Sequence, residues 1–476
     1  MAFNSIDYLI FLIVAFVIHW VLPQRARMFW LWALSYFFYA QWNEKYLFLI
    51  AVSTLVDYSC ALGMERKPGK AKLYLAISLL SNLGILFTFK YLGFFSEIAF
   101  QLGEILGRPI YVPILEILLP VGISFYTLQT LSYSIDVYKK QIKAEPSFPH
   151  FATFVSFFPQ LVAGPIERAK HILPQLHRTP TLDADRFNSG LRLILWGLAK
   201  KTVIADRLAP HMEYVYHQHS NPDSGTVLLA SLLANVLIYV DFSAYSDIAI
   251  GSARILGYNL RLNFHFPLFS RSMPDFWKRW HTSLHDFFID YVYRPIGGRR
   301  VPWAQWLFNI FIIFIISGLW HGAAWNFVVW SIFHMLLVWG HIHLAKLWTW
   351  LGWQTPASPW HQLWQIPLVH LQRALSMIFF FIPDPSRAWE LFTGLFVSGY
   401  SLQPSALLPY PAFVQLLLIL GPLALMIIEG IHLRRSWSDR LKTMPLPLNW
   451  GLHYLLIFAI AILGVETNNP FIYFQF

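Results

Sequence analysis

The chain has 476 residues, of which 56% are hydrophobic and 13% are charged, and its net charge is +10. Soluble domains carry about 25% charged residues, so this composition excludes a soluble fold and predicts a helical membrane protein. The basic residues stand in short loops between apolar runs, which indicates contact with lipid headgroups and excludes a nucleic-acid partner. The single cysteine, Cys60, excludes an intramolecular disulfide and a cysteine-based metal cluster, and we expect no metal ligands.

The first 143 residues alternate apolar runs with basic loops. A bilayer needs about 20 apolar residues, so membrane spans are predicted at 7–22, 28–40, 46–64, 73–89 and 113–131, with a short extra element at 91–106. The first run lacks the basic start and the cleavage site of a signal peptide, so we expect it to be retained. If residues 91–106 do not cross, the basic loops place the N-terminus outside the cytoplasm, because lysine and arginine favour cytoplasmic loops: 23–27, 65–72 and 139–143.

Residues 149–168 are apolar but are interrupted by Pro159, Gly164 and Pro165. Proline removes a helical hydrogen bond, and irregular backbone survives at membrane depth only where protein or a watery cavity satisfies it. The segment is therefore either a re-entrant loop that lines a cavity or a kinked ordinary span.

Two helices are predicted next, at 188–204 and 226–257. Lys200 and Lys201 near the end of the first indicate that it ends at a membrane interface. The second carries Asp241 and Asp247 in an apolar context, and a spacing of six does not place both on one helical face. Paired-carboxylate chemistry is therefore not expected. The two carboxylates are predicted to orient a histidine or a substrate hydroxyl, or to cap a broken helix.

Basic and aromatic residues interleave over residues 263–300. From Asp275, which follows a proline and is a candidate cap, the pattern suits a helix that lies at the membrane surface. Lys278 and Arg279 are expected to face headgroups or a phosphorylated ligand. His281 falls within this predicted helix.

Residues 307–333 form two apolar runs around His321 in the stretch SGLWHGAAW. An ionisable group at membrane depth is costly, so it usually has a task or a partner there. Gly318, Gly322 and Ala323 add almost no bulk, and we expect them to leave room for a substrate. A buried histidine with a single hydrogen-bond partner is the alternative.

Further spans are predicted at 366–382, 413–431 and 452–465, and Asp384-Pro385 indicates a helix start. Arg434, Arg435, Arg440 and Lys442 are expected in a cytoplasmic loop. The count is about 11–13 transmembrane or re-entrant helices, an all-α polytopic fold. We expect one integral-membrane domain over 1–476, with a motif-bearing core at about 113–345 and C-terminal helices at 364–476.

Five stretches closely resemble the membrane-bound O-acyltransferase family, and within it the bacterial branch that serves alginate O-acetylation. They are FPQLVAGPIER at 158–168, YVDFSAYSDIAIG at 239–251, NFHFPLFSRSMPDFWKRWHTSL at 263–284, SGLWHGAAW at 317–325 and the closing NNPFIYFQF. Ala244 stands where that branch usually has glycine. The resemblance implies many helices around a central funnel that reaches the cytoplasm.

The resemblance also implies site residues, with His321 as the catalytic histidine and His281 as a second functional one. A histidine suits this chemistry because its pKa lies near neutrality, so it can remove the proton of an acceptor hydroxyl. Lys278, Arg279 and Trp320 are expected at the acyl-donor site. The lysine and the arginine would hold CoA phosphates there or, alternatively, contact lipid.

The resulting prediction is a multi-pass enzyme of the bacterial inner membrane. It moves an acetyl group from cytoplasmic acetyl-CoA, with no permanently bound cofactor, toward an exported alginate-like polysaccharide, with a periplasmic acetyltransferase as partner. Peptidoglycan, cellulose, teichoic acid or another envelope polymer is an alternative acceptor. A transporter without chemistry is the alternative from another class, although the paired halves typical of transporters are not evident.

Overall fold

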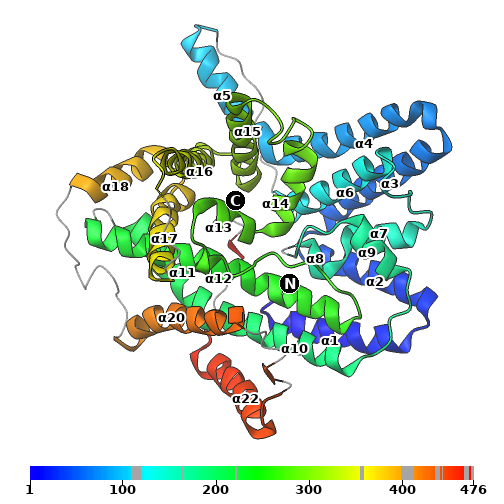
Figure 1. Cartoon of the computed structure of the whole chain (residues 1–476). Coiled ribbons are helices and arrows are strands. Elements are labelled where there is room, and N and C mark those ends of the chain that lie inside the picture. Colours follow the sequence, from blue (N-terminus) through cyan, green and yellow to red (C-terminus); the bar gives the residue numbers. More distant parts are fainter. Residues whose placement is uncertain are drawn as a thin grey trace. The chain divides into compact units, whose positions relative to one another are not determined.

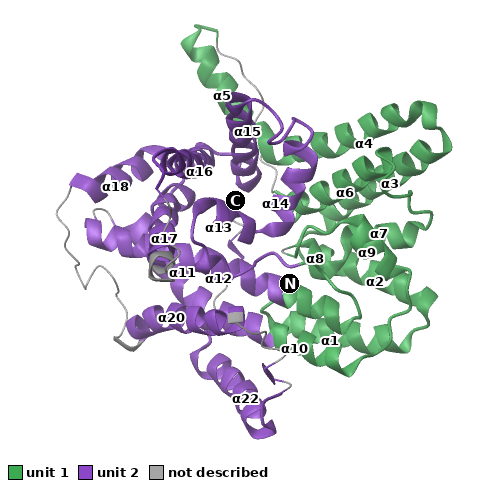
Figure 2. Ribbon diagram, in the orientation of Figure 1, with its two compact units in different colours: residues 1–194, 248–261 green, residues 195–247, 262–476 purple. Residues whose placement is uncertain are grey.

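The computed structural model describes residues 1–108, 119–162, 164–219, 222–353, 359–397, 412–434, 440–441, 443–465 and 471–472. Within these ranges all the regular secondary structure is helical (Figure 1). The chain forms two compact units: unit 1 holds residues 1–194 and 248–261, and unit 2 holds residues 195–247 and 262–476 (Figure 2). Helices α10 (Ala184–Ala199) and α12 (Ser224–Ile255) contribute to both units.

Seven of the described helices are long and apolar enough to cross a membrane: Glu44–Arg66, Pro68–Ile105, Ser224–Ile255, Trp303–His321, Trp325–Trp350, Val414–Leu433 and Leu446–Leu463. A shorter apolar helix covers Ile6–Val21. These helices confirm an all-α polytopic membrane protein. The predicted total of 11–13 helices also counted short and re-entrant elements, and it stays a prediction. The central funnel and the single domain over residues 1–476 also stay predictions.

In the part of unit 1 that the structure describes there are nine helices, together with parts of α10 and α12: α1 (Ile6–Val21), α2 (Gln24–Ala40), α3 (Leu47–Arg66), α4 (Ala71–Leu86), α5 (Leu92–Ile105), α6 (Ile123–Tyr138), α7 (Phe148–Ser156), α8 (Phe158–Leu161) and α9 (Ala169–Leu176). The first begins where the Ser5 side chain accepts a hydrogen bond from the Tyr8 N–H, which satisfies a backbone donor that the helix itself leaves unpaired. The first three predicted spans match α1 to α3 within a few residues. The start of the span predicted at 113–131 lies outside the described residues.

One prediction in unit 1 changes and another is confirmed. The run at 91–106 is no separate element, because α4 and α5 belong to one helical stretch, Pro68–Ile105, with a π-helical turn at Phe87–Tyr91. The segment at 149–168 is broken, as its prolines predicted. Two short helices, α7 and α8, meet at Phe157, whose ψ of 108° departs from a helix. The first has 9 residues and the second 4, so neither is long enough to cross a bilayer.

A buried polar cluster joins α3, α4 and α6. Asp57 is fully buried, and its carboxylate accepts hydrogen bonds from Ser78 Oγ at 2.6 Å and from Asn82 Nδ2 at 2.8 and 2.9 Å. Ser78 Oγ also lies 2.8 Å from Ser134 Oγ on α6. Because an unsatisfied polar group is costly in an apolar interior, this cluster fixes the register of the three helices.

The described residues of unit 2 form nine more helices: α11 (Asp206–Glu213), α13 (Met273–Arg279), α14 (Thr282–Phe288), α15 (Trp303–His321), α16 (Trp325–Trp350), α17 (Pro359–Phe381), α18 (Pro385–Val397), α20 (Ala412–Arg434) and α22 (Leu446–Leu463). Helix α16 packs against α13, α15 and α17. The predicted start of α18 is confirmed, because the Asp384 carboxylate accepts a hydrogen bond from the Ser386 N–H at 2.9 Å. Arg435 and Lys442 of the predicted cytoplasmic loop, and most of the closing stretch 468–476, lie outside the described residues.

Candidate active site

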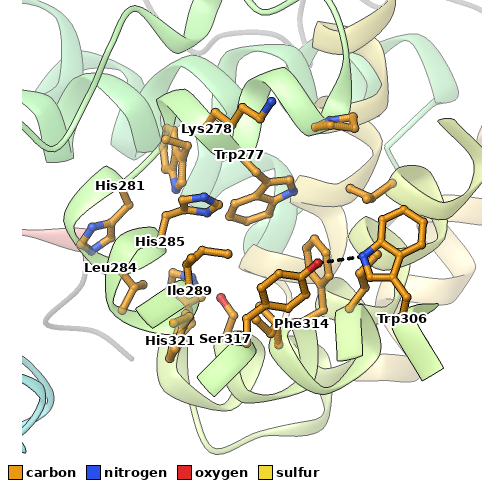
Figure 3. A pocket seen from close by; sticks show the side chains of 17 residues that line it. Trp277, Lys278, His281, Leu284, His285, Ile289, Trp306, Phe314, Ser317 and His321 are labelled. Carbon is orange, nitrogen blue, oxygen red and sulfur yellow. Dashed lines mark hydrogen bonds between the residues drawn. The ribbon is translucent and has the colours of Figure 1, made fainter. Parts of the chain in front are cut away.

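A cavity of about 310 Å³ in unit 2 is lined by both His281 and His321. These residues stand 40 positions apart, on different helical segments. In Figure 3 the two imidazoles lie on one side of the cavity, with Trp306 on the opposite side. Lys278 also lines the cavity and is exposed, whereas both histidines are buried. The cavity therefore connects the surface of unit 2 with two buried imidazoles.

His321 is the last residue of α15, where the apolar helix stops. Gly322, which follows, is extended at φ −162°, and its N–H donates to the Gly318 carbonyl. Ala324 is also extended, and α16 begins at Trp325. The change in direction between two long helices thus fixes the position of the His321 ring. The two apolar runs predicted around this histidine are confirmed as α15 and α16.

His281 lies in a break between helices and not within one, as had been predicted. Helix α13 ends at Arg279, and His281 adopts a left-handed backbone with φ 43° and ψ 54°. A non-glycine residue in this region costs roughly 1–3 kcal/mol and is held there by its surroundings. Such strain is most often found at functional sites.

The preceding loop holds this break open. The Thr282 N–H donates to the Asn263 carbonyl at 2.8 Å, and Ser283 Oγ donates to Asn263 Oδ1 at 2.7 Å. The His265 N–H donates to the Arg279 carbonyl at 3.0 Å. These hydrogen bonds replace those of a continuous helix, so the loop that carries Asn263 sets the position of His281.

The cap of α13 also differs from the prediction. Ser272, and not Asp275, caps the helix: its Oγ accepts a hydrogen bond from the Asp275 N–H at 3.1 Å. Asp275 accepts from the Arg271 N–H at 3.1 Å and from Arg279 Nε at 2.8 Å. Arg279 is therefore engaged within its own helix and does not line the cavity, whereas the neighbouring Lys278 does.

Aromatic rings surround both imidazoles. The Trp320 ring centre lies 5.5 Å from that of His281 and 5.1 Å from that of His321, with both pairs nearly perpendicular. His321 also contacts Trp330 at 5.0 Å, and His281 contacts Phe242 at 4.8 Å. Perpendicular contacts of this kind fix ring orientation as well as burying area. Trp320 contacts the histidines but is not one of the lining residues of the cavity.

Burial determines the charge of His281. The side chain lies between aromatic rings, and desolvation lowers its pKa from 6.5 to about 3. His281 is thus neutral near pH 7, and a neutral imidazole offers one donor and one acceptor nitrogen. His285, which also lines the cavity, has its pKa lowered by burial as well.

The glycines around His321 serve helix packing. A Cβ on Gly318 would stand 2.6 Å from the Phe327 carbonyl oxygen and 2.7 Å from the Ser331 Cβ, and one on Gly322 would stand 2.1 Å from the Phe327 ring. The space beside both glycines is therefore filled by α16. We assign them to the close approach of α15 and α16, and not to the substrate contacts that their small size had predicted.

Asp241 and Asp247 both pair with lysines. Asp241 Oδ1 lies 2.6 Å from Lys201 Nζ, its Oδ2 accepts from the Ile472 N–H at 2.8 Å, and Asp247 Oδ2 lies 2.8 Å from Lys200 Nζ. Both lysines are buried within the protein, and the membrane interface predicted at this helix end stays a prediction. They lie inside unit 2 because carboxylates on α12 compensate their charge there.

Several residues of the site were not singled out from the sequence. Ser317, one turn before His321, and Trp280 line the cavity. The fully buried Arg373 of α17 places its guanidinium 4.0 Å from the Phe276 ring centre and 5.2 Å from that of Trp280. These cation–π contacts pack α17 against Phe276 of α13 and against Trp280, which follows that helix. Serines and a single arginine in apolar runs give no local signal of this role.

The fold and the site define an integral-membrane protein with two buried histidines in a cavity that reaches the surface of one unit. Residues 34–355 match the model of the membrane-bound O-acyltransferase family. The chain belongs to this family, and it is an acyltransferase.

Curated relatives agree with this assignment. The chain is 36% identical to the probable alginate O-acetylase AlgI of Azotobacter vinelandii, over 70% of this chain and 67% of that protein. It is 34% identical to the peptidoglycan O-acetyltransferase of Helicobacter pylori, over 68% of this chain and 67% of that protein. The teichoic acid D-alanyltransferase of Bacillus subtilis is 26% identical over 46% of this chain and 58% of that protein. The matched regions thus cover about two thirds of the length of the first two relatives.

Proposed function

We propose that the protein transfers an acetyl group from acetyl-CoA toward an exported polysaccharide of the alginate type. The observation that carries this proposal is that two buried histidines, His281 and His321, line one cavity together with the exposed Lys278. Its volume of about 310 Å³ lies at the lower end for ligand sites. The cavity therefore suits the acyl-thioester arm of the donor, with the phosphates outside near Lys278.

In this mechanism His321 acts as the general base. It accepts the proton of the acceptor hydroxyl while the hydroxyl oxygen attacks the thioester carbonyl. The tetrahedral intermediate then collapses, the carbon–sulfur bond breaks, and the thiolate takes a proton from the imidazolium. Ser317 and the neutral His281 line the same cavity, and we expect them to donate hydrogen bonds to the carbonyl oxygen or to the leaving sulfur.

Asp241 and Asp247 act indirectly in this proposal. Their lysine partners hold α12, and Phe242 on that helix packs against the His281 ring at 4.8 Å. Trp320 positions both imidazoles. Arg279 stabilises α13, so Lys278 is the stronger candidate for the donor phosphates.

We further propose a bacterial inner-membrane location with the N-terminus outside the cytoplasm, and a periplasmic acetyltransferase that receives the acetyl group. The positively charged loops support this orientation. Peptidoglycan is the second candidate acceptor, because the Helicobacter pylori relative is named for it.

The test is acetyl-CoA turnover by purified protein in detergent, with radiolabelled donor and either alginate or peptidoglycan fragments as acceptor. Wild-type protein should release CoA, and His321→Ala should lower this rate by at least about a hundredfold, the usual size of a general-base contribution. His343→Ala is the matched control, because this exposed histidine lies on α16 and outside the cavity lining. Full turnover in His321→Ala would overturn the mechanism, and absence of turnover in the wild type would favour a transporter.

A further inference from the structure

Two histidines and a glutamate converge in unit 1. One ligand atom from each of Glu145, His150 and His177 lies within 4.8 Å of the others. Glu145 belongs to the loop after α6, His150 to the first turn of α7, and His177 follows the last residue of α9. Imidazole nitrogens and a carboxylate oxygen are the ligands that zinc and its neighbouring divalent metals take in proteins.

The loop that carries Glu145 is fixed by its own hydrogen bonds. The Glu145 N–H donates to Tyr133 Oη at 2.9 Å, and the carbonyl of Pro146 accepts from Tyr58 Oη at 2.7 Å. A proline after Glu145 also restricts the glutamate backbone to extended conformations. The Glu145 carboxylate is therefore held in place before any ion binds, which lowers the conformational-entropy cost of binding.

Ser147 orients both the carboxylate and one imidazole. Its N–H donates to Glu145 Oε1 at 2.9 Å, which leaves Oε2 at 2.7 Å from His177 Nε2. Its Oγ lies 2.7 Å from His150 Nδ1. When His150 Nδ1 carries the proton and donates a hydrogen bond to Ser147 Oγ, the lone pair of His150 Nε2 is available to a cation. Partners of this kind around the ligands are typical of built metal sites.

Burial and charge favour a cation between these groups. The Glu145 side chain is 5% exposed and that of His177 is 47% exposed. The rings of His150 and His177 stack with centres 4.2 Å apart and an angle of 9°. An imidazole binds a metal ion in the plane of its ring, so one ring must turn out of this stack before both nitrogens reach one ion, and the exposed His177 side chain has room to turn. The exposed side leaves coordination positions for water.

We propose that Glu145, His150 and His177 bind one divalent transition-metal ion of the zinc type, completed by water. The ion takes the place of the contact between Glu145 Oε2 and His177 Nε2, because both atoms become its ligands. Zinc bonds of about 2.0–2.2 Å require tetrahedral ligand atoms roughly 3.3–3.5 Å apart. Rotation of the half-exposed His177 side chain out of its stack with His150 would bring the three ligand atoms to this spacing. The bound ion would tie the loop after α6 to the end of α9.

The test is a zinc titration by calorimetry on the full chain, purified in detergent with a tag free of histidine and stripped with EDTA. Wild-type protein should bind one Zn²⁺ per chain. Glu145→Gln and His150→Ala should each weaken binding at least about tenfold, the scale of a lost metal-site interaction. His217→Ala is the control, because His217 and Glu213 form an exposed histidine–glutamate pair, 4.0 Å apart, outside the converging group. This control should bind zinc as the wild type does.

A second measurement keeps the test valid if a variant misfolds. Zinc should raise the thermal midpoint of the wild type and EDTA should reverse the rise, because an ion that binds only the folded state stabilises it. Co²⁺ should give a visible absorption band that Zn²⁺ displaces. Failure of wild-type protein to bind zinc more tightly than the His150→Ala/His177→Ala double variant would overturn the site, as would an unchanged thermal midpoint. Neither readout depends on acetyl transfer.

Discussion

The indole of Trp320 meets the imidazole of His281 with 5.5 Å between ring centres and an angle of 75°. The same indole lies 5.1 Å from the ring of His321, which follows it in the chain. One side chain therefore contacts both histidines of the cavity. The orientation of each imidazole depends on the other through this shared neighbour, which makes Trp320 the natural site for a first test.

Replacing Trp320 separates packing from positioning. Trp320→Ala should cost about 3–5 kcal/mol of unfolding free energy, as large-to-small changes in a core do. Trp320→Phe keeps a ring and should fold, but we expect acyl transfer to fall about ten- to a hundredfold because the imidazoles are less well fixed. Thermal melts and turnover measure the two effects. Trp450→Phe, at a side chain that is 56% exposed, should change neither; wild-type turnover by Trp320→Phe would exclude the positioning role.

Gly318→Ala tests the close packing of α15 and α16. The added methyl would stand 2.6 Å from the backbone oxygen of Phe327, which cannot move as a side-chain end can. We expect a loss of about 1–3 kcal/mol, the usual cost of overpacking, seen as a lower thermal midpoint. Gly340→Ala is the matched control on α16, because nothing lies within 4 Å of its added Cβ. Alanine favours a helix over glycine by about 1 kcal/mol, so this variant should be neutral or more stable. An equal response of both glycines would contradict the packing role.

Lys201→Met should leave the buried Asp241 carboxylate without its ammonium partner. Breaking a buried ion pair from one side costs about 3–5 kcal/mol, because the remaining charge stays desolvated. Asp241→Asn in the same chain should recover part of that loss, since no uncompensated charge then remains at this position. Asp206, 2.9 Å from Lys201 Nζ, keeps the recovery incomplete. A double-mutant cycle on denaturation free energies measures the coupling, and strictly additive losses would show that the pair does not interact.

The buried state of His281 predicts a pH dependence of stability. Its pKa is lowered from 6.5 to about 3 in the folded protein, so below pH 6.5 the unfolded chain binds a proton that the folded chain does not. The free energy of unfolding should therefore fall as the pH drops below that value, by up to about 1.4 kcal/mol per pH unit from this group, and should be fully retained above it.

His281→Gln should remove that contribution. Its unfolding free energy should decline less steeply than that of the wild type between about pH 6.5 and pH 4, and chemical denaturation at each pH compares the two slopes. His343→Ala, at an exposed histidine, is the control. Parallel curves for wild type and His281→Gln would show that the imidazole titrates in the folded state as it does in the unfolded one.

Much of the helical framework was predictable from local signals. Long apolar runs predicted α12, α15 and α16, and Asp384-Pro385 predicted the start of α18. The break at His281 was not predictable, because the residues from Asp275 onward have a good helical pattern. The hydrogen bonds that open the helix come from Asn263 and Thr282, which compete with the helix only once the preceding loop has folded back.

The sequence by itself determined the membrane class and the family and predicted the two histidines as site residues, because composition and short motifs can be recognised along the chain. Only the tertiary structure decided that His281 and His321 share a cavity, that the nearby glycines join helices, and that Lys200 and Lys201 are buried beside carboxylates. The convergence of Glu145, His150 and His177 is likewise invisible along the chain. These facts depend on which distant side chains come into contact. Polar and charged groups need a partner only once helix packing has removed them from water, so the contacts become important for stability only in the folded protein.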